Sequence, residues 1–124
     1  MTRERGVPTC LFLPPPGGPL RLRVDVADRF LPRLIGLLRH PTPPAAGTGL
    51  LLIARGGVHT VGMRYPIDIL QLDADLTVLR ARHGVAPRRV IAAPAGTRAT
   101  LEVAGGSLPS GLTAQRFYCN KDYP

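Results

Sequence analysis

Proline and glycine interrupt this chain so often that long helices and strands are excluded. The 124 residues include 14 prolines and 14 glycines, about twice the share of an average protein. Proline removes a backbone hydrogen-bond donor, and glycine favours turns. The apolar residues between them are patterned and make up 44% of the chain. We therefore expect many short elements joined by turns, in a single domain over residues 1–124.

Short apolar runs between these breaks predict strands. The clearest covers residues 20–26, where Leu20, Leu22, Val24 and Val26 alternate with charged residues, the pattern of a half-buried strand. Further strands are predicted over residues 7–13, 50–53, 67–73, 76–82, 99–104 and 115–119, with at most a short one at 88–92. Residues 83–87 are predicted to form a loop, with His83 in solvent.

One segment has helical spacing instead. Apolar residues in 28–39 fall on one helical stripe, and His40-Pro41 ends it, which predicts one short helix, roughly Pro32 to Arg39. The pattern as a whole predicts a mainly β fold (α+β at most). It would be a small, partly open β-barrel of short strands with one short helix near residues 32–39.

The chain is strongly basic, with a formal net charge of +8. Such a charge favours acidic partners, including nucleic acid. The basic residues are nearly all arginines scattered along the sequence, and no nucleic-acid-binding motif accompanies them. We therefore do not expect specific nucleic-acid binding. A contiguous arginine face formed by Arg21, Arg23, Arg80 and Arg82 would favour it.

Two cysteines, Cys10 and Cys119, lie near opposite ends of the chain. They lack the spacing of a zinc site, so we expect no metal and no cofactor. They could meet if the terminal strands are neighbours, but two reduced thiols are favoured over a disulfide. We see no signal peptide and no apolar run long enough to span a membrane. We expect a soluble, cytoplasmic protein that is a monomer or a weak dimer.

Four segments together resemble a known family. They are Arg33-Leu34-Ile35-Gly36-Leu37-Leu38-Arg39, Gly49-Leu50-Leu51-Leu52, His59-Thr60-Val61-Gly62-Met63-Arg64-Tyr65-Pro66-Ile67-Asp68-Ile69-Leu70 and Leu101-Glu102-Val103-Ala104-Gly105-Gly106. Over about residues 20–112 the chain resembles the bacterial and archaeal domain of unknown function 192 family. The resemblance implies a compact, barrel-like β fold with one short helix and no established activity.

The chain departs from the family pattern at two places. Many relatives carry a Pro-Cys pair before the histidine, where this chain has Ala54-Arg55. Relatives also tend to end the region with Gly-Asp, where this chain has Gly111-Leu112. Any metal-binding or redox role of that cysteine therefore does not carry over to this chain.

His59 and Asp68 are the catalytic candidates. A His–Asp pair orients an imidazole for acid/base work, but a triad also needs a nucleophile. Thr60 and Ser107 lack the sequence context of one. The alternative is structural: His59 bonds a backbone carbonyl, and Asp68 caps a turn or pairs with an arginine.

Arginines and one glutamate complete the candidate site. Arg33, Arg39 and Arg64 could form an anion-binding pocket, because guanidinium groups suit carboxylate and phosphate. The alternative is an internal ion pair of these arginines with Asp68 or Glu102.

Three functional hypotheses follow. We favour a non-enzymatic binding or accessory domain with a small polar cleft around His59, Arg64 and Asp68, taking a small anionic ligand or a protein partner. The second is a small hydrolase using His59 and Asp68 as acid/base residues. The third is a basic nucleic-acid-binding module. The sequence shows no complete catalytic set, so we lean against an enzyme.

Overall fold

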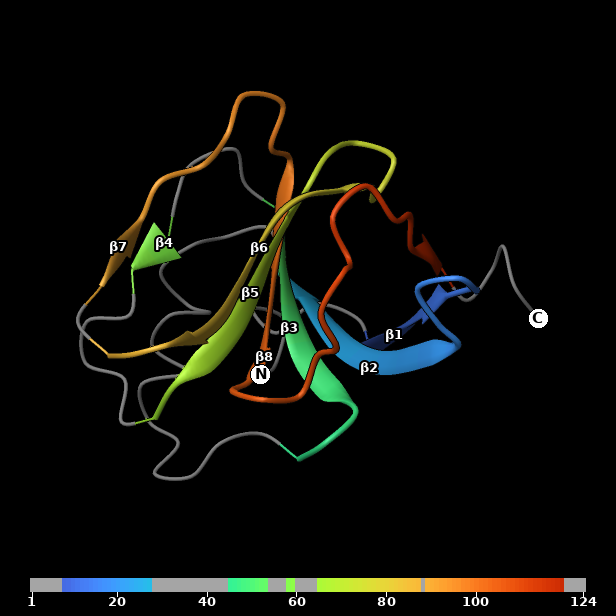
Figure 1. Ribbon diagram of the computed structural model, residues 1–124, viewed down its shortest axis with the longest axis horizontal. Helices are drawn as coiled ribbons and strands as arrows, with labels where there is room; N and C mark the ends of the chain where they lie inside the picture. The colour runs from blue at the N-terminus through green and yellow to red at the C-terminus, as the bar shows by residue number, and fades with distance from the viewer. Residues whose placement is uncertain (1–7, 28–44, 54–57, 60–64, 88, 120–124) are drawn as a thin grey trace.

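The computed structural model describes residues 8–27, 45–53, 58–59, 65–87 and 89–119. Its elements are all strands (Figure 1): β1 (Pro8–Leu13), β2 (Leu20–Ala27), β3 (Thr48–Ile53), β4 (Val58–His59), β5 (Ile67–Leu72), β6 (Val78–Val85), β7 (Val90–Ile91), β8 (Ala99–Ala104) and β9 (Tyr118–Cys119). The predicted mainly β fold is confirmed. The predicted helix near residues 32–39 lies outside the described residues.

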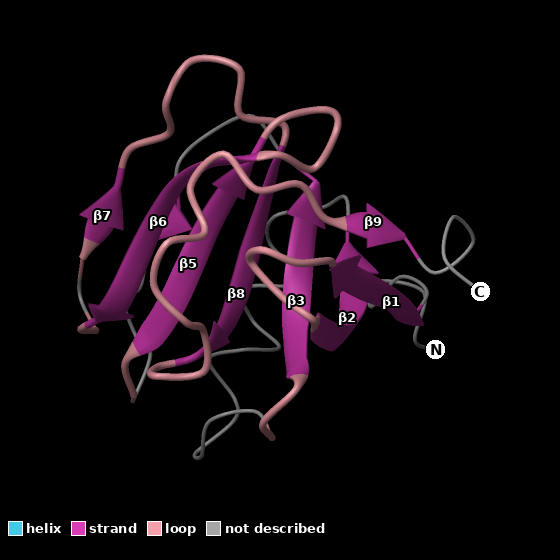
Figure 2. Cartoon of the chain, turned by 45° about the vertical axis from the view of Figure 1, so that its right-hand side comes forward, coloured by secondary structure: helices cyan, strands magenta, loops and turns pink. Residues whose placement is uncertain are grey.

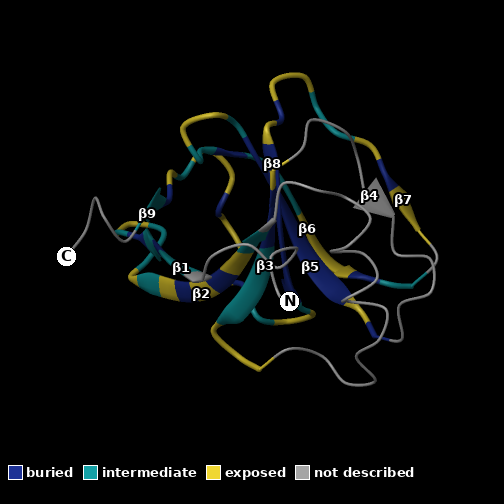
Figure 3. Ribbon diagram, turned by 180° about the vertical axis from the view of Figure 1, so that it is seen from behind, coloured by how far each residue is buried: buried dark blue, intermediate teal, exposed yellow. Residues whose placement is uncertain are grey.

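Seven strands form one twisted, curled sheet (Figure 2) in the order β6-β5-β8-β3-β2-β1-β9, and β4 and β7 form a separate two-stranded ribbon. The paired strands are antiparallel except β2 and β3, which run parallel. β5 and β8 therefore lie towards the middle of the fold, with every residue of β5 buried (Figure 3).

Main-chain bonds join the two edges of the sheet at one end. The segment before β9 pairs with the residues around the start of β6: the Val78 N–H donates to the Gln115 carbonyl (2.8 Å), the Ala114 N–H to the Val78 carbonyl (2.8 Å) and the Phe117 N–H to the Leu76 carbonyl (3.0 Å). We call this segment pair, Leu76–Val78 with Ala114–Phe117, the closing seam. Because β9 also pairs with β1, the sheet curls into the predicted partly open barrel.

The two faces of the sheet carry separate apolar clusters. The inner face holds the larger one, which includes Leu22, Leu70, Leu101, Val103 and Phe117. The outer face holds a smaller one: Leu52, Tyr65, Ile67, Ile69, Val85 and Ile91. Since neighbouring residues of a strand point to opposite faces, both clusters are built from the same strands. Ile91 belongs to β7, so the β4–β7 ribbon lies against the outer face.

One sequence prediction is wrong near the end of β6. Residues 83–85 were predicted as part of a loop, but β6 continues to Val85. The register shifts between Ile67 and Ile69, so His83 and Gly84 form a bulge opposite Asp68. Gly84 has φ +61°, a conformation that glycine adopts without strain. Gly84, predicted to lie in the loop, belongs to a bulge within the strand.

The two cysteines do not pair, although β1 and β9 are neighbours. Cys119 packs against the inner-face cluster, whereas Cys10 precedes the inner-face residue Leu11 and so points to the outer face. Both are free cysteines. Adjacent strands therefore bring the two backbones together and keep the thiols apart.

Candidate functional site

The outer face of the sheet holds four buried polar side chains. Tyr65, Gln71, Thr100 and Glu102 are each at most 7% exposed, and we call them the polar cluster. Gln71 of β5 lies directly opposite Thr100 of β8, and Glu102 follows Thr100 by two residues on the same face. Tyr65 belongs to the apolar cluster of this face. The cluster therefore lies in the middle of the sheet, on the side of the β4–β7 ribbon.

Three polar atoms of the cluster have no hydrogen-bond partner among the described residues. They are the Tyr65 hydroxyl, Gln71 Oε1 and Thr100 Oγ1, all buried. Leaving a buried polar atom unsatisfied costs about 1–3 kcal/mol, and native proteins rarely tolerate it without a reason. Three such atoms on one face make the polar cluster the candidate functional site.

One hydrogen bond ties the polar cluster to the chain just after β7. Gln71 Nε2 donates to the carbonyl oxygen of Ala92 at 2.7 Å. A carbonyl only accepts, so the amide must present its nitrogen there and its oxygen elsewhere. This contact fixes the orientation of the Gln71 side chain.

Tyr65 and Glu102 interact electrostatically. Burial raises the pKa of the Tyr65 hydroxyl above its usual value of 10.0, and the negative charge of Glu102 raises it further. Both effects disfavour a tyrosinate next to a carboxylate in an apolar setting. Tyr65 therefore stays a neutral donor and acceptor at physiological pH.

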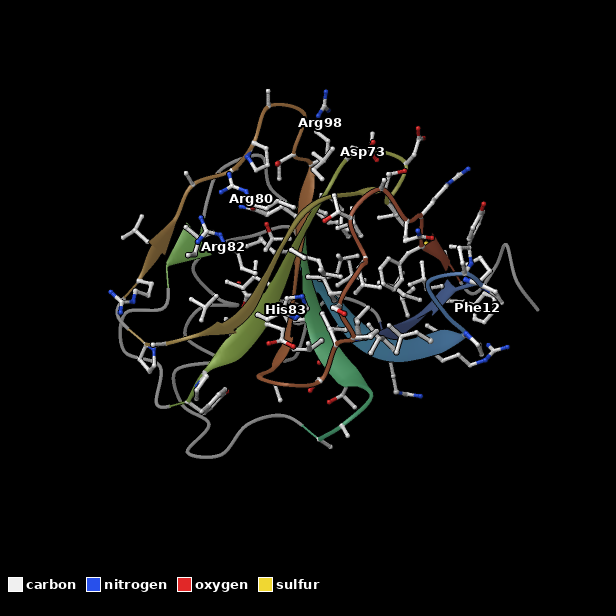
Figure 4. All side chains as sticks on the ribbon, in the orientation of Figure 1. Phe12, Asp73, Arg80, Arg82, His83 and Arg98 are labelled. Atoms are coloured by element: carbon white, nitrogen blue, oxygen red, sulfur yellow. The ribbon has the colours of Figure 1, made fainter. Side chains whose placement is uncertain are left out.

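Two arginines of β6 flank the polar cluster. Arg80 lies opposite Gln71, and Arg82 lies opposite Ile69, so both belong to the outer face. Figure 4 shows both side chains on the side of β6 that faces the β4–β7 ribbon, with His83 on the other side. The cluster therefore has a carboxylate at its centre and guanidinium groups at its β6 edge.

Asp68 lies on the inner face and holds the backbone of two other segments. Its Oδ1 accepts from the N–H groups of Gly84 (2.8 Å) and Gly106 (3.1 Å), and its Oδ2 accepts from Leu108 N–H (3.0 Å). The side chain is fully buried, and His83 Nδ1 lies 3.7 Å from Oδ2. This carboxylate stabilises the β6 bulge and the turn after β8.

In that turn, the backbones of Gly105 and Pro66 approach each other closely. A Cβ on Gly105 would lie 3.0 Å from the carbonyl oxygen of Pro66, and the Gly105 N–H donates to the same oxygen. The Pro66 to Asp68 segment and the Gly105-Gly106 pair therefore pack as one unit, in which a larger residue at 105 would push the chains apart.

The structure separates the two predicted acidic site residues. Asp68 lies opposite Val103 in the sheet, so Asp68 and Glu102 point to opposite faces. His59 lies in β4, and its backbone is opposite Val90 of β7. The ribbon that carries His59 contacts the outer face, where Glu102 lies, through Ile91. The pairing of the His59 and Asp68 side chains stays a prediction.

Of the remaining predicted site residues, most lie outside the described part of the chain. Arg33, Arg39 and Arg64 lie outside the described residues, and so does the anion-binding pocket they were predicted to form. Thr60 also lies outside the described residues. Ser107 lies in the turn after β8. Tyr65, Gln71 and Thr100 were not among the site residues predicted from the sequence. Gln71 and Thr100 sit in apolar strands, where a polar residue normally marks a solvent-facing side, and no sequence signal shows that both faces are covered.

The described residues contain neither a metal-binding group nor a membrane-spanning helix. No group of three or more His, Cys, Asp and Glu could hold a metal ion. No helix in the same part of the chain is long and apolar enough to cross a membrane.

The comparison with family models identifies the chain. Residues 14–114 match the model of DUF192, described as "Uncharacterized ACR". The chain belongs to the DUF192 family. A comparison with curated proteins finds no match.

Two solved structures resemble this DUF192 domain. A protein from Sinorhizobium meliloti 1021, named a "putative transcription regulator", is 18% identical with a TM-score of 0.78, and the match covers 92% of this chain and 95% of that one. A protein of unknown function from Novosphingobium aromaticivorans DSM 12444 is 16% identical with a TM-score of 0.74, over 95% and 96% of the two chains. At these identities the likeness shows the fold alone.

Proposed function

We propose that this DUF192 domain is a non-enzymatic binding protein and that the polar cluster is its ligand site. The observation that carries the proposal is the set of unsatisfied buried atoms on Tyr65, Gln71 and Thr100. A protein without a ligand would be more stable with apolar residues there. A small molecule that bonds to these atoms regains that free energy as affinity. A non-enzymatic binding domain is also the function favoured from the sequence. The proposed site now consists of the polar cluster in place of His59, Arg64 and Asp68.

The hydrolase alternative gains no support from Asp68. A general acid or base must exchange protons with a substrate, whereas both oxygens of Asp68 already accept backbone N–H groups inside the barrel. The position of Asp68 is what a turn-stabilising carboxylate needs.

The nucleic-acid alternative gains no support from the arginines. Arg21 and Arg23 lie on β2, and Arg80 and Arg82 lie on β6, with three strands between β2 and β6 in the sheet order. Arg21 stacks on the Phe12 ring, with its guanidinium carbon 4.6 Å from the ring centre. The two pairs are separated by β5, β8 and β3 and do not form the contiguous basic face that this function would need.

The test is a thermal-shift comparison of the wild type with the double variant Tyr65→Phe/Thr100→Val. Both proteins are heated with uncharged polyols, primary amines, and carboxylate or phosphate anions. We expect one class to raise the Tm of the wild type by several degrees through preferential binding to the folded state, and to leave the double variant unchanged. If every class affects both proteins equally, the polar cluster is not the ligand site.

A further inference from the structure

We infer that the ligand of the polar cluster is an uncharged polyhydroxylated molecule, a polyol or a sugar. This inference rests on the proposed function and names the chemical class that fits the site. Three properties of the described residues lead to it: the hydrogen-bonding polarity of the cluster, the charges around it and the apolar side chains beside it.

Two members of the polar cluster, Gln71 and Glu102, offer a ligand only hydrogen-bond acceptors. The amide nitrogen of Gln71 is committed to the Ala92 carbonyl, so Oε1 is the atom left for a ligand, and an amide oxygen only accepts. The carboxylate of Glu102 likewise only accepts. The ligand must therefore donate hydrogen bonds to at least part of the site.

The two remaining members are hydroxyls, which both donate and accept. Thr100 Oγ1 and the Tyr65 hydroxyl are buried with no partner among the described residues. A ligand hydroxyl can donate to one cluster atom and accept from another at the same time. An ionised carboxylate brings only acceptors, and phosphate brings mostly acceptors and further negative charge, to a site that already contains a carboxylate. This polarity argues against the anionic ligand expected from sequence.

The surrounding charges argue against a cation. Arg80 is directly opposite Gln71 on the neighbouring strand, at a separation of roughly 5 Å between Cβ atoms. Arg82 flanks Ile69 in the same way, and the whole chain carries a net charge of +8. An organic cation would be repelled by these groups, whereas guanidinium N–H groups can donate to the oxygen of a hydroxyl.

Apolar side chains lie beside the polar atoms. Leu52, Ile69 and Ile91 are buried in the same outer-face cluster as Tyr65. The carbon skeleton of a polyol or sugar ring presents C–H groups that pack against such side chains, while its hydroxyls bond at the edges. A small ion with no carbon skeleton would leave this part of the site unused.

The experiment is an NMR titration of the full chain. The uncharged probes are myo-inositol and glucose, and the charged probes are putrescine and inorganic phosphate. We expect one uncharged probe to shift the amide signals of β5 and β8 in a saturable way. Thr100→Val should weaken that binding about tenfold, the effect of one lost hydrogen bond. Thr100→Ser keeps the hydroxyl and should bind about as well as the wild type.

Thr97→Val is the matched control, because Thr97 is also a buried threonine but its hydroxyl already donates to the Pro94 carbonyl in the turn before β8. It should bind the probe normally. Saturable binding of putrescine or phosphate alone, weakened by Thr100→Val, would overturn the ligand class and leave the proposed function standing. Polyol binding that Thr100→Val does not weaken would overturn both, and the absence of polyol binding would overturn the inference.

Discussion

At the scale of single residues, burial on both faces of the sheet explains what the sequence did and did not reveal. Glu102 was a candidate site residue because it is a charge in an alternating strand, and it belongs to the polar cluster. Gln71 has the same alternation, with Leu70 and Leu72 facing the inner core, and so resembled an ordinary surface residue. Among the described residues, the contacts of Ile91 and Ala92 with the outer face give it an interior environment.

Tyr65 gives the first prediction. Because burial and the charge of Glu102 raise its pKa, it should ionise at a higher pH than an ordinary tyrosine, as a late step in a titration of tyrosinate absorbance. Tyr65→Phe should remove the late step. Glu102→Gln should lower the pKa of Tyr65 only in part, because burial is the larger cause.

The same shift has a consequence for stability. The folded state holds the Tyr65 proton more tightly than the unfolded state, so this contribution is complete below pH about 10 and is lost as the pH rises through the folded pKa. The wild type should therefore lose stability more steeply than Tyr65→Phe above pH about 10. Identical pH profiles of unfolding free energy would show that Tyr65 is not buried beside a charge.

At the scale of elements, β5 uses its two faces for different purposes. Its outer face contributes Gln71 to the polar cluster, and its inner face contributes Asp68 to the β6 bulge and the turn after β8. The sequence predicted strands over residues 67–73 and 76–82, which correspond to β5 and most of β6, because a run of apolar residues is a local signal. It did not predict the bulge, since the bulge depends on Asp68 and Gly84, which are distant in sequence and meet only in the folded sheet.

Asp68→Asn tests this role of β5. The amide nitrogen of asparagine is a donor, so one of the backbone N–H groups now bound by Oδ1 and Oδ2 loses its acceptor inside the barrel. We expect a loss of about 2–4 kcal/mol in the free energy of unfolding, measured with urea.

Asp73→Asn is the matched control. Asp73 uses a single oxygen, Oδ1, for the N–H groups of Asp75 (2.8 Å) and Thr77 (3.0 Å), and an amide oxygen can replace it. The loss should stay below about 1 kcal/mol. Equal losses in the two variants would contradict the assignment of Asp68 as the buried carboxylate that joins the bulge and the turn.

At the scale of the whole molecule, the barrel depends on a closing seam that local patterns do not encode. Strand existence was predictable for most of the sheet, and so was the mainly β barrel class. The order of the strands and the pairing of Ala114–Phe117 with Leu76–Val78 were not, because long-range pairing leaves no periodic signal. Of the polar cluster, only Glu102 was predicted as a site residue. The other members come together through long-range strand pairing, which the sequence pattern does not show.

The seam also stores backbone strain. Leu76 and Ala114 have φ of 66° and 72°, which costs a residue with a Cβ about 1–2 kcal/mol. Ala114 is exposed, so Ala114→Gly should relieve strain and raise the unfolding free energy by about 0.5–1 kcal/mol.

Ala95→Gly serves as the comparison, since Ala95 is exposed in another turn and is not among the described residues with positive φ. That variant should lose up to about 1 kcal/mol from backbone entropy. A loss of stability in both variants, measured by urea unfolding, would contradict the strained seam.

The most direct test of the polar cluster compares two buried threonines in the ligand-free protein. Thr97 Oγ1 donates to the Pro94 carbonyl at 2.7 Å, whereas Thr100 Oγ1 has no partner among the described residues. Urea unfolding should show that Thr97→Val lowers the unfolding free energy by about 1 kcal/mol and that Thr100→Val raises it by about the same amount. A loss in Thr100→Val equal to that in Thr97→Val would mean that the hydroxyl is already satisfied, and would contradict the ligand site.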